Sequence, residues 1–508
     1  MVARAYTVAF DGIAARPVEV QCALSPGMPG FSIVGLPDKA VSEAKERVRA
    51  AFAALAIALP ARKITVNLSP ADLPKEGSHF DLAIALGVLA AMEVVPADRV
   101  AEVVGFGELS LDGTLEPVSG ALPAALTAAA EGRGFICARA SGPEAAWVEA
   151  AAVVPAESLG AVIAHLNGTA PLALATPGEV SAAVEWRDLA EVKGQERAKR
   201  ALEIAAAGRH HLLLIGTPGS GKSMLARRLP GLMPPLGATE VLETSMIHSL
   251  SGLISEGGIS RERPFREPHH TASMAAIVGG GKGAKPGEIS LAHNGVLFMD
   301  EFPEFSRQVL ETLRQPIETG SVVVARANAH IRYPCRFLLV AAANPCKCGY
   351  LADPSRACPK VPVCGDDYLG RISGPLMDRF DLRVDVPPVT YGDLDLPANG
   401  EPSAAVAARV AAARRAQSVR YADCPEAAVN ADAEGALLSA VAPVDAEGRK
   451  LLGRAAERFG LSARGYHRVL RVARTIADLA GEETIGTGHL AEALSYRLSH
   501  VSPLASVG

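Results

Sequence analysis

The sequence predicts a multidomain α/β protein, and three observations lead to this prediction. Its 508 residues exceed one ordinary domain and fit two to four domains. An apolar run at 212–215 leads into a glycine-rich loop and then into a helical pattern, which is the order strand, loop, helix. Two more apolar runs, at 295–299 and 337–343, end in acidic or amide side chains.

The loop after the first run indicates what this protein binds. It reads G-x-x-x-x-G-K-S, and its glycines allow successive backbone N–H groups to surround phosphate oxygens without Cβ clashes. The positive end of the following helix attracts the same anion. We expect Lys222 to reach the β- and γ-phosphates of ATP and the hydroxyl of Ser223 to bind Mg²⁺. The predicted nucleotide-binding residues are Gly216, Thr217, Pro218, Gly219, Ser220, Gly221, Lys222 and Ser223.

Composition restricts the partners and the compartment. The net charge of −5 and the pI near 6.2 exclude a globally basic protein, so any contact with nucleic acid must be local. No basic-then-apolar leader follows Met1, and no uncharged apolar run is long enough for a bilayer. Eight cysteines, half of them clustered, suit a reducing cytoplasm better than a disulfide framework. We therefore expect a cytoplasmic protein with no membrane partner.

Residues 1–166 are expected to form a separate α+β domain. Strand-like runs at 63–68 and 103–106 lie beside helix-like segments at 38–55 and 80–92. Both periodicities within one stretch of this length are consistent with a sheet covered by helices.

Two segments of this domain, at 73–81 and 107–113, resemble the protease domain of Lon, whose fold is shared with ribosomal protein S5 domain 2. On that pattern, the nucleophilic serine of Lon falls on His79 and its lysine falls on Leu122. A serine nucleophile needs an adjacent base, and these positions supply neither group. The resemblance implies a Lon-like fold without peptidase activity, used as a platform for assembly or DNA contact.

A linker at 167–185 separates this domain from a predicted nucleotide-binding core at 186–388. At 192–195 the core reads V-K-G-Q, directly before the helix that leads to the phosphate loop. In AAA+ ATPases a V-x-G-Q segment at this place lines the adenine pocket, so the core resembles that superfamily.

The second and third apolar runs end in candidate catalytic residues. Asp300 and Glu301 follow the second run in the form called Walker B. We expect Asp300 to hold Mg²⁺ and Glu301 to polarise the attacking water as general base. Asn344 follows the third run, where its amide can touch the γ-phosphate, the role called sensor 1. For both segments, a surface turn is the alternative. The spacing from Lys222 disfavours a turn for Asp300 and Glu301, whereas a turn remains an open alternative for Asn344.

Two insertions extend this core beyond the minimal one. The first carries Lys282 and Lys285, and the second, a predicted β-hairpin, carries Arg326 and Arg332. They resemble the helix-2 insert and pre-sensor-1 hairpin of the AAA+ subgroup that includes magnesium chelatase and the MCM helicases. In a ring such insertions point into the pore, where these cations would pair with DNA phosphates. Solvated charge on loops remains an equal alternative.

Two places in the sequence carry side chains that can bind a metal ion. The adjacent histidines His269 and His270 are expected to order their loop, because neighbours on an extended segment point to opposite faces. Four cysteines that follow Asn344 are better zinc candidates, since thiolates within one short loop suit tetrahedral zinc and metal stabilises a loop without a core. Free thiols are the alternative. These residues are Cys346, Cys348, Cys358 and Cys364.

Arg379 ends a predicted helix just before a strand. AAA+ rings place there the arginine finger, which reaches the γ-phosphate bound by the neighbouring subunit. Arg371 is the reserve candidate, and an internal salt bridge to Asp378 or Asp381 is the alternative.

Residues 389–508 are expected to form a helical lid with a basic face. Its segment at 462–468 reads S-A-R-G-Y-H-R, in which Arg464 resembles sensor 2, the arginine that closes the lid onto the nucleotide. Arg468 is the other candidate for that role, and a solvated helix face is the alternative reading.

The whole chain resembles the ComM/YifB family of magnesium-chelatase-like AAA+ ATPases. The resemblance rests on the Lon-like domain, R-P-F-R-x-P-H-H, G-V-L-F-M-D-E-F, N-P-C-x-C-G, S-G-P-L-x-D-R-F-D-L and the lid motif. It implies a hexameric ATPase that uses ATP and Mg²⁺ and drives branch migration of DNA in recombination or natural transformation. The alternatives are a magnesium-chelatase motor subunit and, disfavoured by His79 and Leu122, an ATP-dependent protease or unfoldase. Relatives often carry a second Cys-x-Cys pair, whereas Lys360 replaces its second cysteine here.

Overall fold

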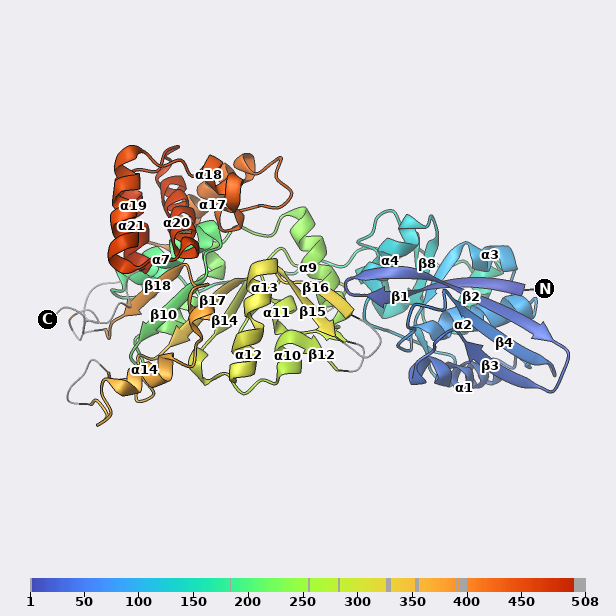
Figure 1. Cartoon of the computed structure of the whole chain (residues 1–508). Coiled ribbons are helices and arrows are strands. Elements are labelled where there is room, and N and C mark those ends of the chain that lie inside the picture. Colours follow the sequence, from blue (N-terminus) through green and yellow to red (C-terminus); the bar gives the residue numbers. More distant parts are fainter. Residues whose placement is uncertain are drawn as a thin grey trace.

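The computed structural model describes residues 2–182, 184–254, 256–281, 284–325, 330–351, 356–389, 392 and 400–497. The chain forms an N-terminal α+β part, a central α/β core and a helical C-terminal part (Figure 1). The N-terminal part and the C-terminal helices lie against different sides of the core, so each contacts a different set of core elements.

A seven-stranded sheet organises the N-terminal part. Strands β1 and β2 pair antiparallel at its centre, and parallel pairs extend the sheet at both ends. The strand order is β3 (Gly30–Val34), β4 (Lys63–Ser69), β2 (Ala14–Ser25), β1 (Val2–Asp11), β5 (Val103–Phe106), β8 (Gly134–Ala138) and β9 (Val153–Ala156). The other elements are α1 (Lys39–Ala54), α2 (Phe80–Ala91), α3 (Ala97–Ala101), β6 (Glu108–Leu109), β7 (Leu115–Glu116), α4 (Ala121–Ala130), α5 (Gly142–Ala145) and α6 (Leu159–Leu166).

Helices α1 and α2 differ in how their sequences meet the sheet. The helix α1 begins at an N-cap, where the Asp38 side chain accepts a hydrogen bond from the N–H of Val41, and it buries only one face. The helix α2 is apolar almost throughout and is buried along its whole length, because the sheet and α1 enclose it. Both helices match the sequence-based expectation to within about two residues.

The central core contains a five-stranded parallel sheet. Its order is β11 (Phe265–Arg266), β14 (Val296–Met299), β17 (Leu338–Ala343), β10 (Leu212–Gly216) and β18 (Leu382–Val386). Since all strands are parallel, the segments that follow them meet at one edge and the segments that precede them meet at the other. The helices of the core are α7 (Glu196–Gly208), α8 (Lys222–Ala226), α9 (Ala238–Leu250), α10 (Met274–Val278), α11 (Glu288–Leu291), α12 (Arg307–Thr312), α13 (Arg314–Thr319), α14 (Val363–Leu369) and α15 (Gly374–Met377).

The two insertions form small antiparallel pairs outside this sheet. In the first, β12 (Gly279–Gly280) pairs with β13 (Lys285–Pro286). In the second, β15 (Ser321–Ala325) pairs with β16 (His330–Pro334), which is the hairpin that the sequence predicted.

The C-terminal part is helical. It consists of α17 (Ser403–Arg420), α18 (Gly435–Val441), α19 (Ala446–Phe459), α20 (Ala463–Ala480) and α21 (Thr487–Arg497). The helices α17 and α20 share one apolar core with α7 and with strands of the parallel sheet. A parallel α/β core and a helical C-terminal part confirm those elements of the predicted fold class. The Lon-like assignment of the N-terminal part and the domain boundaries stay predictions. No helix among the described residues is long and apolar enough to cross a membrane.

Candidate functional site

A pocket of about 690 Å³ opens at the edge of the parallel sheet where the strands end. The phosphate loop forms one wall of this pocket, since it connects the end of β10 to the start of α8. The Nζ of Lys222 donates hydrogen bonds to the carbonyls of Gly216, at 2.7 Å, and Thr217, at 2.9 Å. It also donates to Oδ1 of Asn344, at 3.1 Å, which links the phosphate loop to the end of β17. Burial lowers the pKa of Lys222.

The acidic residues of the predicted Walker B strand line the same pocket. The hydroxyl of Ser223 donates to Oδ2 of Asp300 at 2.5 Å, so two oxygen ligands of the kind that Mg²⁺ prefers lie together. Glu301 follows directly, and its backbone lies in the left-handed region with φ 50°. The structure thus brings together the predicted phosphate loop, both acids and Asn344, which were separated by up to about 120 residues in the chain.

His270 also lines this pocket, at a position beside Glu301 that the sequence did not predict. Its Nδ1 lies 3.2 Å from Oε2 of Glu301, and its ring packs edge-on against Phe305. His269 lines the same pocket and hydrogen-bonds to the hydroxyl of Thr271 at 2.7 Å. Ordering of the loop was predicted for both histidines, but the sequence gave no signal that they lie beside the Walker B glutamate, because β11 and β14 become neighbours only in the folded sheet.

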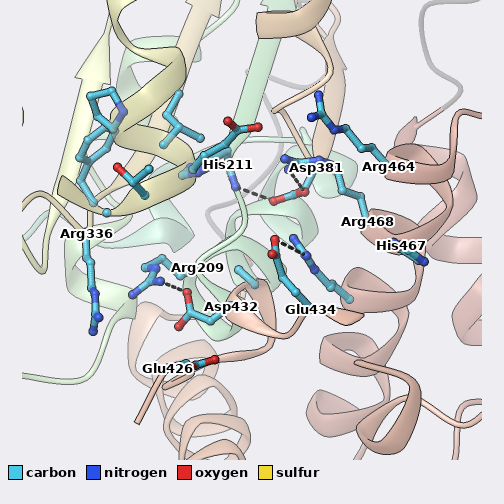
Figure 2. Close-up of a pocket in the computed structure, with 18 of the residues that line it drawn as sticks. Arg209, His211, Arg336, Asp381, Glu426, Asp432, Glu434, Arg464, His467 and Arg468 are labelled. Carbon is cyan, nitrogen blue, oxygen red and sulfur yellow. Dashed lines mark hydrogen bonds and ion pairs between the residues drawn. The ribbon is translucent and has the colours of Figure 1, made fainter. Parts of the chain in front are cut away.

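A second pocket, of about 600 Å³, lies at the opposite edge of the sheet, where strands begin (Figure 2). His211 precedes β10 and Asp381 precedes β18, while Arg464 and Arg468 reach over them from α20. Arg468 donates to Oδ1 of Asp381 at 2.6 Å. Among the described residues, the guanidinium of Arg464 has no hydrogen-bond or ion-pair partner.

Arg379 lies beside this second pocket and is 4% exposed. It donates to the carbonyl of Pro375 at 2.7 Å and forms an ion pair with Glu318. Burial and the nearby cations of Arg464 and Arg468 lower its pKa, while Glu318 opposes this shift. Arg371, the reserve candidate for the arginine finger, forms an ion pair with Glu304 at 3.0 Å.

The position of Arg464 changes one prediction. A sensor 2 residue that closes onto its own nucleotide must lie at the phosphate-loop edge of the sheet. Arg464 instead lines the pocket at the opposite edge, together with residues that precede strands. Arg464 and Lys222 therefore lie beside opposite ends of the strands of the parallel sheet.

Comparison with known proteins gives a consistent result. The chain is 45% identical to the competence protein ComM of Haemophilus influenzae, over 97% of this chain and 96% of that protein. It is 44% identical to YifB of Escherichia coli, over 97% of this chain and 96% of that protein. The chain belongs to the ComM/YifB family.

Family models and a more distant relative place this ComM/YifB-family chain among magnesium-chelatase-like AAA+ proteins. The model described as magnesium chelatase, subunit ChlI, matches residues 188–394, and its C-terminal counterpart matches 400–497. A model described as subunit ChlI of Mg-chelatase matches 18–141. The 38 kDa magnesium-chelatase subunit of Rhodobacter capsulatus is 27% identical over 61% of this chain and 86% of its own length.

The candidate DNA-contacting residues of this family member are only partly described. Lys282 and Arg326 lie outside the described residues. Lys285 is exposed at the start of β13, and Arg332 is exposed on β16. Both therefore present cationic side chains on the insertions, as the sequence predicted.

The zinc prediction is not supported. The Sγ atoms of Cys346 and Cys348 lie 3.1 Å apart and form a thiol–thiol hydrogen bond. Cys364 lies in the first turn of α14 rather than in a second Cys-x-Cys pair. Within the described ranges, no group of three or more histidine, cysteine or acidic side chains is arranged to hold a metal ion.

The two N-terminal positions that the sequence resemblance matches to the serine and lysine of Lon carry buried side chains. His79 is buried against Phe10, Phe80 and Phe106, and its Nε2 donates to the carbonyl of Val8 at 3.0 Å. Leu122 is 1% exposed within the apolar core. Both side chains therefore pack the interior of the domain, and the absence of peptidase activity stays a prediction.

Proposed function

We propose that this protein is a ring-forming ATPase that acts on DNA, as a helicase or branch-migration motor in recombination or natural transformation. The observation that supports it best is the division of candidate catalytic groups between two edges of one sheet. The phosphate loop, Asp300 and Glu301 lie at one edge, and Arg379 and Arg464 lie at the other. A second copy of the chain would bring the two sets together.

Each group has a distinct part in hydrolysis. Lys222 and the loop N–H groups bind the phosphates, and Ser223 and Asp300 would hold Mg²⁺, which neutralises charge on the phosphates. Glu301 accepts a proton from the attacking water, and Asn344 orients that water beside the γ-phosphate. Arg379 and Arg464 of the neighbouring copy stabilise the charge that develops on the transferred phosphoryl group.

Two observations support DNA as the partner. One close relative is named a competence protein. The exposed Lys285 and Arg332 also lie on separate insertions, and cations held on two small hairpins suit a phosphate backbone read without regard to sequence.

The test is ATP turnover and strand displacement with single-stranded, forked and four-way DNA, each at several salt concentrations. We expect DNA to stimulate turnover, and the stimulation to weaken steeply as salt rises because phosphate contacts release counterions. The variant Lys222→Ala should remove both activities. Turnover that is indifferent to every DNA tested would reject DNA as the partner while leaving the ATPase assignment intact.

A magnesium-chelatase motor subunit is the second candidate function. It is favoured by the chelatase family models and by the 27% identity to a chelatase subunit. That relative covers 61% of the chain, whereas the competence protein covers 97%. Turnover stimulated by porphyrin-binding chelatase subunits but not by DNA would favour this function. An ATP-dependent protease is disfavoured, and degradation of casein that a serine-directed reagent blocks would revive it.

A further inference from the structure

The N-terminal part contacts the second insertion of the core, the end of α9 and the segment that follows α9. The turn that joins β1 to β2 reaches the second insertion, the hairpin of β15 and β16 (Figure 1). The backbone N–H of Gly120, at the start of α4, donates to the carbonyl of Ser249 at 3.1 Å, near the end of α9. The indole of Trp147 donates to the carbonyl of Gly257 at 2.8 Å, in the segment that leads to the first insertion.

The contact at the β1–β2 turn is very close. Gly12 has φ +68°, and a Cβ atom placed on it would lie 2.5 Å from the carbonyl oxygen of Arg332 on β16. The next residue, Ile13, packs against the apolar core of the central part, as does Ile331. The glycine is therefore needed twice, for the left-handed turn and for the approach of one backbone to the other.

This contact adds to the packing of a hairpin whose inward side chains, Val322, Val324 and Tyr333, are buried in the core of the central part. A two-stranded hairpin is only marginally stable in isolation, so β15 and β16 depend on what packs against them. The residue whose carbonyl faces Gly12 is Arg332, whose side chain is exposed on the same strand. A shift of this strand would move the cation that is predicted to meet DNA phosphate.

We propose that the N-terminal domain is a brace for the pre-sensor-1 hairpin, with the Gly12–Ile13 turn holding β16 and thereby positioning Arg332. The effect of this brace on ATP turnover rests on the proposed function, because the position of the hairpin influences turnover only if the hairpin binds DNA. The effect on the hairpin itself does not depend on that function. Removing the contact should lower the local stability of β15 and β16.

The decisive comparison is between Gly12→Ala and Gly132→Ala. Gly132 has nearly the same backbone, with φ +66°, but a Cβ there would meet no atom within 4 Å. The two variants therefore share the strain of a left-handed alanine, and only Gly12→Ala disturbs the contact with Arg332. Ile13→Ser removes the packing without altering the glycine, and Ile163→Ser, within the N-terminal core, is its control.

The first measurement is amide hydrogen exchange of the peptides that contain 321–325 and 330–334 in the full-length protein. We expect exchange about ten-fold faster in Gly12→Ala and Ile13→Ser, and unchanged in Gly132→Ala and Ile163→Ser. Equal protection of the hairpin in Gly12→Ala and Gly132→Ala would overturn the brace, whatever the activity of the protein.

The second measurement separates the brace from the proposed function. In Gly12→Ala we expect ATP turnover without DNA to be unchanged and stimulation by DNA to fall several-fold. Loss of both in parallel would indicate a general structural defect and contradict the proposal. If the unaltered protein is not stimulated by DNA, the proposed function fails, while the exchange experiment still decides whether the brace exists.

Discussion

At the scale of single residues, Lys222 makes the clearest prediction. Its ammonium group already holds two loop carbonyls and Asn344, so it is positioned for phosphate oxygens. We expect Lys222→Ala to lower ATP turnover by about 10²–10³-fold, as removal of one transition-state donor does. Release of inorganic phosphate measures this. The control is Lys39→Ala, which removes an exposed lysine of α1 far from the site.

Arg379 tests whether the site is shared between subunits. We expect Arg379→Ala to lower turnover by at least about 10³-fold while ATP binding is retained, because the residue acts on the nucleotide of the next subunit. Glu318→Gln keeps the guanidinium and removes only its charged partner, so it should retain most activity. Normal turnover in Arg379→Ala would reject its assignment as arginine finger.

The lowered pKa of His79 makes the free energy of unfolding depend on pH. Burial lowers its pKa from 6.5 to about 4, while the bond to Val8 opposes the shift. Between these values the unfolded chain binds a proton that the folded protein does not, so stability falls as pH drops from 6.5 towards 4. His79→Phe should make this fall shallower in urea unfolding at several pH values. Part of it should persist, because burial also lowers the pKa of His211 to about 4.

At the scale of elements, one buried ion pair joins α1 to α2 beside the apolar contacts between the two helices. Arg47 contacts both carboxylate oxygens of Asp81, at 2.5 and 2.8 Å, and the side chain of Asp81 is fully buried. Arg47→Ala would leave that charge buried without its partner, which costs about 3–5 kcal/mol of unfolding free energy. Urea unfolding measures it. Removal of the exposed pair of Lys39 and Glu43 on α1 should change stability by less than about 0.5 kcal/mol.

The same scale shows how far the sequence predicted local structure. The structure contains the helices expected at 38–55 and 80–92 and the hairpin expected in the second insertion. In each segment the spacing of apolar residues fits a single type of secondary structure. The predicted zinc site is not supported among the described residues, since ligand spacing along a chain does not determine how side chains come together in the fold.

At the scale of the whole molecule, the division of catalytic groups predicts that activity needs assembly. We expect sedimentation velocity with ATP and DNA to show a closed oligomer, and dilution below its dissociation constant to lower turnover per subunit. Lys222→Ala should assemble less readily if bound ATP bridges two subunits. A protein that stays monomeric in saturating ATP and DNA, yet hydrolyses ATP at its full rate, would contradict the shared site.

Some residues of the candidate site were predicted from the sequence, and others became evident only in the tertiary structure. The phosphate loop and the Walker B pair were predicted from the sequence because each is a short, continuous segment whose residue types are fixed by the chemistry of phosphate and Mg²⁺. The contact of His270 with Glu301 was not predicted, since it joins segments that meet only across neighbouring strands.

The sequence by itself determined that this chain has a nucleotide-binding core of the magnesium-chelatase type between an α+β part and a helical part. Only the tertiary structure decided which edge of the sheet carries each arginine, and that the N-terminal part reaches the insertions. The physical reason is that a short sequence pattern depends only on residues that are neighbours along the chain. Distances between remote segments depend on strand order and on packing, which no short segment encodes.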